Sequence, residues 1–294
     1  MCVVMAKYFK DYGWVSAKNR DRNYTPDITF ERKTGEDGIE RLLFVDQITQ
    51  YSEGVNSRGV SILGASLMVQ DDEKEVSKGT KDHSPDGIRI SNALKEATAK
   101  LAAMSCIESK LTGSNIIIDD DSCYLIEACN DLKGQYRFRV KEIQPNETVA
   151  RTNHGIWLPW AGYQRKAGDE NQTLSRISSE ARLAQAQIVV DTAGDPEDMI
   201  DGMCQMMVDH PQLNIMRTDT KRKKMRTTAQ LMEIPTERTL YCRPVSSNIN
   251  FDFWKLNQPE ADTWVELLSN RALYRDVKDG DPPFDGLSNT HSID

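Results

Sequence analysis

The chain has 294 residues, of which 38% are hydrophobic and 28% charged, and this composition is typical of a soluble globular protein of one or two domains. The 37 basic and 45 acidic residues give a net charge of −8, which argues against nucleic acid as a partner. The basic run 221–224 is interpreted as a solvated loop.

Two further exclusions concern membranes and export. No apolar run approaches the roughly 18 residues that a membrane span needs, so no membrane span is expected. The first ten residues have neither a basic region nor a long apolar region, so a secretory signal is not expected. We therefore expect a cytoplasmic protein.

The six cysteines, at positions 2, 106, 123, 129, 204 and 242, contain no CxxC pair and no zinc-like spacing with histidine. The last five are interpreted as reduced, mostly buried small residues. No metal and no organic cofactor is expected. The run 119–121 is three aspartates, but no further ligands follow at calcium-loop spacing, so we interpret it as the polar tip of a hairpin.

The first half of the chain is predicted to be rich in β-structure, with one helix. Short apolar runs separated by turn residues predict strands, and one apolar stripe from Ile90 through Leu94, Ala97 and Leu101 to Met104 predicts a single helix. The expected strands are 2–6, 14–17, 27–31, 39–45, 60–69, 115–118, 123–128 and 136–143.

The second half is predicted to be mixed. One helix is expected over 177–188, with Ile177, Ala181, Ala184 and Ile188 on its apolar face. Another is expected from Pro196, with a methionine stripe at 199, 203, 206 and 207 that fills core space. A hairpin of 227–234 with 239–243, a short late helix over 264–268 and a frayed tail after 279 complete the chain. The simplest partition is one α+β domain over 1–294, with a core at 2–245 and a C-terminal helix and tail at 246–294.

The first candidate catalytic residue is Cys2, directly after the initiator methionine. Removal of Met1 would leave a thiol and a free α-amine on one residue. Their reference pKa values, about 8.5 and about 7.7–8.0, are close enough for the amine to act as general base for the thiol. Such a nucleophile needs no histidine, and the chain has only four.

Three other segments have side chains that suit this chemistry. Lys18-Asn19-Arg20-Asp21 follows the second strand, where pairing would bring it beside Cys2; a carboxylate there could hold the amine, and a cation could lower the thiol pKa. Asn153, within Thr152-Asn153, could donate to an oxyanion. Ser178-Ser179-Glu180-Ala181-Arg182 begins a helix, where a serine could be a cap and Arg182 could brace the site.

In this order the segments resemble the superfamily of N-terminal-nucleophile (Ntn) hydrolases that includes penicillin V acylase, bile salt (choloylglycine) hydrolase and acid ceramidase, and most closely its relatives in peptidase family C45, the isopenicillin N acyltransferase-like proteins. The family pattern is an N-terminal Cys, then R-N-x-D, G-x-N-x-x-G-L, T-N and S-S-x-x-R. The resemblance covers roughly 2–245, and its remaining segments are 54–60, the hairpin 119–127 and the closing segment 239–244.

The resemblance implies an α+β fold of four layers, αββα, with two antiparallel sheets between helices. It implies an enzyme that cleaves a linear carbon–nitrogen amide bond of a small N-acyl substrate. By position, Cys2 is the nucleophile and base, Asp21 binds the amine, Asn153 donates to the oxyanion and Arg182 supports the nucleophile.

Two positions depart from the pattern. The early family arginine falls on Lys18, which keeps the charge but loses the bidentate fork; Arg20 occupies a usually apolar position and could substitute. A backbone N–H near Gly64 or Ala65 is the candidate second oxyanion donor. The aromatic residues proposed to line an acyl pocket are Trp14, Trp157, Trp160 and Tyr163.

Two alternatives stay open at this point. One is a C45-like acyltransferase or self-processing precursor, in which an amine accepts the acyl group or the chain cleaves itself before the cysteine. The other is a catalytically silent Ntn-fold binding protein, which retention of Met1 would favour because it blocks the α-amine. A homo-oligomer is compatible with either, and the substrate is not specified.

Overall fold

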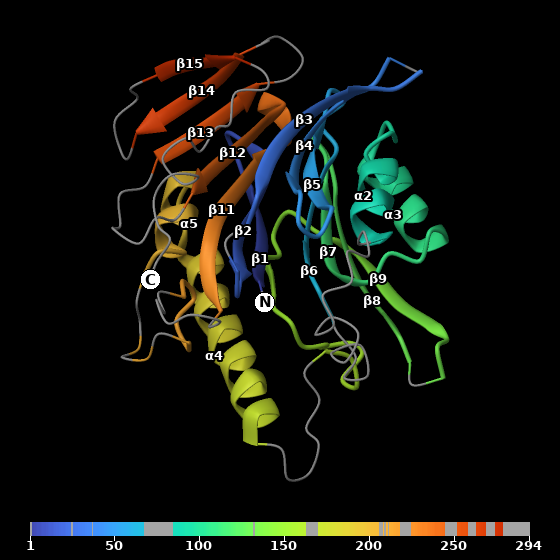
Figure 1. The fold of residues 1–294 in the computed structure, drawn as a ribbon, viewed down its shortest axis with the longest axis vertical. Coiled ribbons are helices and arrows are strands. Elements are labelled where there is room, and N and C mark those ends of the chain that lie inside the picture. Colours follow the sequence, from blue (N-terminus) through green and yellow to red (C-terminus); the bar gives the residue numbers. More distant parts are fainter. Residues whose placement is uncertain are drawn as a thin grey trace.

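The structure is a computed structural model that describes residues 2–24, 26–36, 38–67, 85–131, 133–162, 170–205, 208, 210, 212–217, 225–244, 252–257, 263–268 and 274–278. Within these residues, the chain forms two antiparallel β-sheets that stack face to face, and helices cover the outer face of each sheet (Figure 1). The expected four-layer α+β sandwich is therefore confirmed. The tail after 279 and the basic run 221–224 lie outside the described residues.

The first sheet contains both strands expected to form the site, and all of its neighbouring strands are antiparallel. In spatial order its strands are β10 (Val149–Arg151), β1 (Cys2–Phe9), β2 (Gly13–Arg22), β11 (Arg226–Ile234), β12 (Thr239–Pro244), β13 (Asp252–Asn257), β14 (Thr263–Leu268) and β15 (Tyr274–Lys278).

The second sheet is a meander in which every strand pairs with the next one along the chain. In spatial order its strands are β3 (Ile28–Thr34), β4 (Glu40–Asp46), β5 (Tyr51–Asn56), β6 (Ser61–Ala65), β7 (Gly113–Ile118), β8 (Cys123–Asn130) and β9 (Tyr136–Ile143). Short connections, which favour antiparallel neighbours, join all of these strands except β6 and β7, between which the chain forms α2 (Pro85–Ala93) and α3 (Ala99–Glu108).

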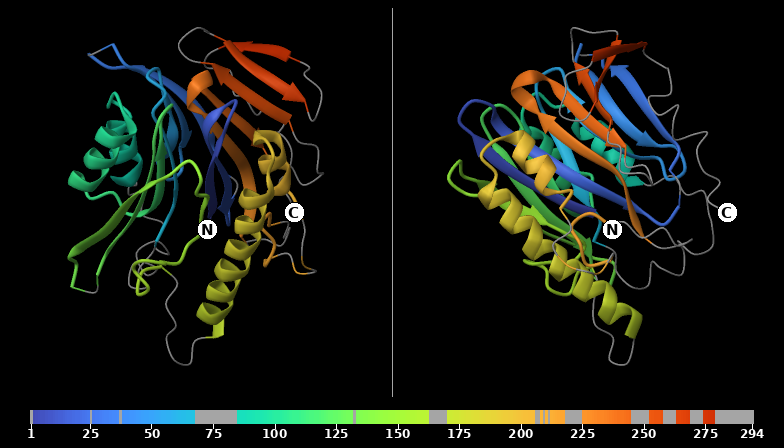
Figure 2. Two further views of the ribbon diagram at one scale, coloured as in Figure 1. Left: turned by 180° about the vertical axis from the view of Figure 1, so that it is seen from behind. Right: turned by 90° about the vertical axis from the view of Figure 1, so that its left-hand side faces the viewer.

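Side-chain alternation in β1 and β2 divides the residues of the site between two layers. Because successive residues of a strand point to opposite faces, Cys2 and Val4 lie in the core between the sheets, whereas Val3 and Met5 pack in the core under α4 (Glu170–Thr192) and α5 (Pro196–Gly202). Figure 2 shows this helical layer on one side of the sandwich. A shift of one residue in this register would exchange the two sets.

The helix predicted as one stripe over 90–104 is two helices, α2 (Pro85–Ala93) and α3 (Ala99–Glu108), so that prediction was wrong. Thr98 caps α3 by accepting a hydrogen bond from the backbone N–H of Leu101. The new helix axis turns Leu101 and Met104 out of the core, and small residues, Ala99, Ala102, Ala103 and Cys106, pack there instead.

The late helix predicted over 264–268 is also wrong, because these residues belong to β14. A run this short has no decisive period, and Trp264 and Val265 are of the aromatic and β-branched types that favour strands. Pairing with β13 and β15 gives the backbone its hydrogen bonds. The expected C-terminal helix is thus replaced by strands at the edge of the first sheet.

The expectations for the aspartate run and for two of the methionines are confirmed. The aspartate run is the tip of the β7–β8 hairpin, where Asp119 accepts backbone N–H bonds from Asp121 and Ser122. No group of three metal-type side chains occurs in the part of the chain that the structure describes. Met199 and Met203 are fully buried in the core under α5, while 206 and 207 lie outside the described residues. Among the helices described, none is long and apolar enough to cross a bilayer.

Candidate active site

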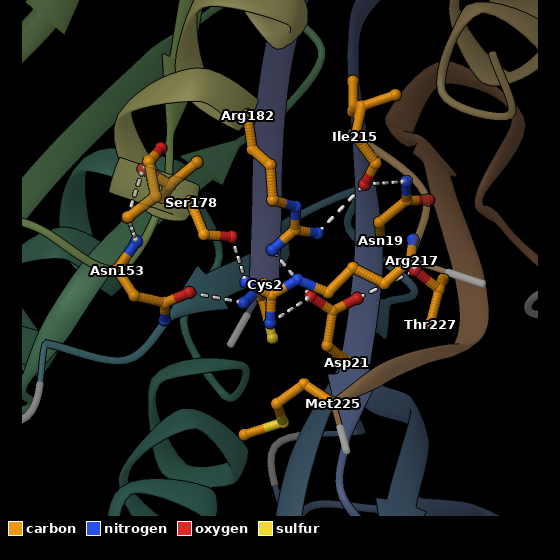
Figure 3. Close-up of polar contacts among 12 residues, drawn as sticks. Cys2, Asn19, Asp21, Asn153, Ser178, Arg182, Ile215, Arg217, Met225 and Thr227 are labelled. Atoms are coloured by element: carbon orange, nitrogen blue, oxygen red, sulfur yellow. Dashed lines mark hydrogen bonds and ion pairs between the residues drawn. The ribbon is translucent and has the colours of Figure 1, made fainter. Parts of the chain in front are cut away.

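Cys2 is the first residue of β1, and its side chain is buried on the inner face of the first sheet. The strand lies between β2 and β10, so both neighbours contribute groups around it. The backbone nitrogen of Cys2 donates to Oδ1 of Asn153 over 2.6 Å (Figure 3). Once Met1 is removed, this nitrogen is the α-amine of the chain.

Asn153 directly follows the short strand β10 and its side-chain orientation is set from both ends. Its Oδ1 accepts from Cys2, and its Nδ2 donates to the carbonyl oxygen of Ser66 over 2.7 Å. Exchange of the two amide atoms would oppose donor to donor and acceptor to acceptor, so only one orientation fits. An amide NH₂ group has two hydrogens, and the second one makes no hydrogen bond within the described residues.

A buried cluster beneath Asn153 holds its backbone. The N–H of Asn153 donates to Oγ of Ser179 over 3.1 Å, and this hydroxyl lies 2.8 Å from Nδ1 of His154. Burial lowers the pKa of His154 to about 4, so the imidazole is neutral at physiological pH. The second serine of the Ser178-Ser179 pair therefore positions Asn153 and is not a helix cap, since α4 begins at Glu170.

Asp21 lies on the face of β2 that points to α4, away from the Cys2 thiol. Its carboxylate is 2.7 Å from Nη1 of Arg182 and 3.7 Å from Nη1 of Arg217, and it accepts from the hydroxyl of Thr227. Figure 3 shows the two guanidinium groups above and beside the carboxylate. In this structure the Cys2 N–H donates to Asn153 and Asp21 pairs with Arg182, so the expected contact between Asp21 and a free amine stays a prediction.

Arg182 occupies a polar buried face of α4 that the sequence pattern did not indicate. Its Nε and Nη2 donate to the carbonyls of Asn214 and Ile215, each over 3.0 Å. The helix was predicted correctly, but its predicted apolar face was wrong, because Ile177 and Ile188 are exposed. The face of α4 that turns inward is the one that carries Arg182, whose guanidinium binds these buried loop carbonyls.

Positive charge surrounds the Cys2 thiol. Burial by itself raises the pKa of this thiol. In the untrimmed chain, the ammonium of Lys18, the amino-terminal charge at residue 1 and Arg22 outweigh burial and lower the pKa to about 7. Nη1 of Arg22 lies 3.7 Å from Sγ. By contrast, burial raises the pKa of the Cys106 thiol to about 12. Arg22 was missed by the sequence analysis, although it directly follows the charged segment 18–21.

Lys18 and Arg20 both point into the space between the sheets, and each forms an ion pair with a carboxylate of the second sheet. Nζ of Lys18 forms an ion pair with Glu53, and Nη2 of Arg20 lies 2.5 Å from Asp46. Arg20 is the direct cross-strand partner of Cys2, but its guanidinium is committed to Asp46. The sequence analysis missed both acids. The signal was available, because two inward cations in a sandwich require buried carboxylates on the facing strands.

The Gly64 N–H, suggested as a second oxyanion donor, is already used. It donates to Oε1 of Glu53 over 3.1 Å, so this suggestion is corrected. Its neighbour Ala65 is paired with Ser114 in the β6–β7 ladder.

The four aromatic residues expected at an acyl pocket lie in different places. Trp14 is fully buried at the opposite end of β2 from Arg20, six residues along the strand or roughly 20 Å, so it does not reach Cys2. Trp157 packs on the core that contains Cys2, with its ring 4.9 Å from the guanidinium of Arg151. Trp160 packs against Leu158 and Ala161 in a neighbouring cluster. Tyr163 lies outside the described residues.

Comparison with known proteins finds no matching family model and no matching curated protein. Among solved structures, the chain is similar to penicillin V acylase from Agrobacterium tumefaciens, with 11% identity, a TM-score of 0.47, and 95% of this chain and 98% of that chain covered. It is also similar to two variants of conjugated bile acid hydrolase from Clostridium perfringens. Both are 10% identical; one has a TM-score of 0.46 with 88% and 92% covered, the other 0.49 with 92% and 98%.

Proposed function

We propose that this chain is a cysteine Ntn hydrolase that cleaves a linear amide bond of a small N-acyl substrate through an acyl-enzyme on Cys2. The observation that carries the proposal is the 2.6 Å contact between the Cys2 nitrogen and Oδ1 of Asn153, at a residue whose thiol pKa is about 7. An amine and a thiol with similar proton affinities on one residue are the two groups that this mechanism requires.

In the proposed reaction, the α-amine of Cys2 takes the thiol proton and Sγ attacks the substrate carbonyl carbon. The carbonyl oxygen becomes an oxyanion, and the second N–H of Asn153 donates to it. Collapse of this intermediate breaks the carbon–nitrogen bond, and the ammonium of Cys2 protonates the departing amine. Water then adds to the thioester, the amine again takes a proton, and the acid is released with regeneration of the thiol.

The remaining groups have supporting roles in this proposal. Lys18 and Arg22 stabilise the thiolate through charge, and Arg20 keeps β2 and β4 together through Asp46. Asp21 and Arg182 hold the end of β2 that lies beside Cys2 against α4. Trp157 is the aromatic residue proposed to contact an acyl group, because its ring lies 4.9 Å from the guanidinium of Arg151, the cross-strand partner of Val4 near Cys2.

The proposal includes a reducing, cytoplasmic location, since all six cysteines are free thiols. It requires neither a metal nor an organic cofactor. The peptidase C45 subtype remains part of the proposal and rests on the order of motifs alone.

The first test is the intact mass of the purified protein before and after brief treatment with iodoacetamide at pH 7. We expect a mass that lacks Met1 and one rapid adduct that maps to Cys2, and no rapid adduct in the Cys2→Ser variant. A panel of N-acyl amides, with and without an added amine acceptor, then separates hydrolysis from acyl transfer. A retained Met1 together with an unreactive Cys2 would contradict the mechanism and favour the silent alternative.

A further inference from the structure

A buried ion pair joins the two sheets close to Cys2. Lys18 is the cross-strand partner of Val4, which lies next to Cys2 on the inner face of β1. Its Nζ pairs with Oε1 of Glu53 from β5, and both side chains are 1% exposed or less. No other ion pair of Lys18 is found among the described residues, so Glu53 is what offsets the cost of burying this ammonium.

The carboxylate of Glu53 is itself held by the backbone. Oε1, the same oxygen that binds Lys18, accepts the N–H of Gly64 over 3.1 Å. A β-carbon at position 64 would collide with the side-chain ends of Asn115 and Tyr51, which occupy the space beside this glycine. The position of the Lys18 charge is therefore set by the second sheet, through Glu53.

A second acid, Glu233 from β11, lies near this pair. Burial raises the pKa of Glu233 well above its ordinary value, and the charge of Glu53 raises it further. The hydroxyls of Ser16 and Ser61 and the charge of Lys18 act in the opposite direction, and the Ser16 contact is a long one of 3.4 Å. No ion pair between Glu233 and Lys18 is found among the described residues, so the three side chains form one ion pair, Lys18 with Glu53, and one further acid.

We propose that Glu53 is a positioning residue for the nucleophile: its ion pair fixes the Lys18 ammonium inside the sandwich, where the Lys18 charge stabilises the Cys2 thiolate. This role rests on the proposed function only in taking Cys2 as the nucleophile. Glu233, which forms no ion pair with Lys18 among the described residues, does not share in it.

Of the charged side chains around the thiol, Lys18 contributes most to stabilising the thiolate. Arg20 is neutralised by Asp46, and Asp21 on the far face of β2 opposes the thiolate. Arg22 contacts the sulfur but is also 3.5 Å from Asp46. Among side chains, Lys18 exerts the largest lowering effect on the thiol pKa. Without Glu53, the buried Lys18 ammonium would lose its ion-pair partner and its fixed position, which would weaken that effect.

The test is the pH dependence of Cys2 alkylation by iodoacetamide in the full-length, Met1-trimmed protein. In Glu53→Gln we expect the thiol pKa to rise by about 1–3 units. In the matched control Glu233→Gln we expect no shift, because the isosteric amide leaves the ion pair between Lys18 and Glu53 in place. In a Lys18→Met background, Glu53→Gln should add no further shift, since its effect acts through Lys18.

Three results would overturn the proposal: an unchanged or lower thiol pKa in Glu53→Gln, an equal rise in Glu233→Gln, or a rise that persists in the Lys18→Met background. If Glu53→Gln does not fold, the double variant Lys18→Met/Glu53→Gln carries no unpaired buried charge, and it is compared with Lys18→Met alone. Alkylation needs no substrate, so a shifted thiol in a protein without amidase activity would uphold this inference and refute the proposed function.

Discussion

Oδ1 of Asn153 lies 2.6 Å from the backbone nitrogen of Cys2, although the two residues are 151 positions apart. The pairing of β1 with β10 brings them together, because Val4 opposite Arg151 places Cys2 beside the residue two positions further on. Asn153 thus binds the group that is the catalytic base in the proposed mechanism, and its second amide N–H makes no hydrogen bond within the described residues. The same side chain can orient the amine and respond to charge on the substrate.

Replacement of Asn153 by alanine should lower amide turnover about 10²–10³-fold, the usual cost of one oxyanion donor. Both the amine contact and the donor are lost, so the fall should appear in kcat and kcat/KM alike. The measurement is steady-state hydrolysis with the best substrate from the amide panel. Asn130→Ala, which changes an exposed asparagine at the end of β8, is the control and should retain full activity.

The rate of Cys2 alkylation should rise through pH 7. A thiol with a pKa of about 7 is mostly protonated at pH 6 and mostly thiolate at pH 8. Cys106, whose thiol pKa is about 12, should remain unmodified in the folded protein over this range. Peptide mapping after short exposure at each pH reports both sites. A midpoint at or above pH 9 for Cys2 would show that the surrounding cations do not activate it.

Stability should fall as the pH is lowered from 6.5 toward 4 because of His154. The pKa of His154 is about 4 in the folded protein, whereas the ordinary value, which applies to the unfolded chain, is 6.5. As the pH falls, the unfolded chain therefore becomes protonated at this residue before the folded protein does. The contribution is fully present above pH 6.5 and should decline by about 1–3 kcal/mol on approach to pH 4. Urea unfolding at pH 7 and pH 5 measures it. In His154→Gln this pH-dependent part should disappear, whatever the absolute stability of the variant.

Replacement of Arg182 by methionine should destabilise the fold by about 3–5 kcal/mol, because it leaves the buried carboxylate of Asp21 with only the more distant Arg217. Arg176→Met on the same helix is the matched control. Arg176 pairs with Glu180 at the surface, where the loss should stay below about 1 kcal/mol. Urea denaturation of both variants at one pH makes the comparison.

A recovery experiment separates charge from packing at Arg182. Asp21→Asn in the Arg182→Met background removes the unpaired buried charge, so part of the lost stability should return. If the double variant is less stable than Arg182→Met by the full cost of a second independent mutation, the two residues are not coupled.

Much of the fold and of the candidate site could be predicted from the sequence where local pattern is sufficient. Alternating strands and turn residues located the β1–β2 and β7–β8 hairpins, and pairing of β1 with β2 placed the segment 18–21 beside Cys2. Cys2, Lys18 and Asn153 were identified by residue type and order. The break at Thr98 between α2 and α3 was missed, because the spacing of apolar residues continues across this capping threonine and gives no sign that one helix ends and another begins.

The sequence by itself determined which residues have the required chemistry: a thiol next to the chain end, cations on one strand and an amide far along the chain. Only the tertiary structure decided what each one contacts. Strand alternation places Lys18 and Asp21 on opposite faces of β2, and the partners of Lys18 and Arg20 come from the other sheet. A buried charge is stable only when it is paired with an opposite charge. The identity of that partner depends on how the two sheets stack, and no local sequence pattern encodes the stacking.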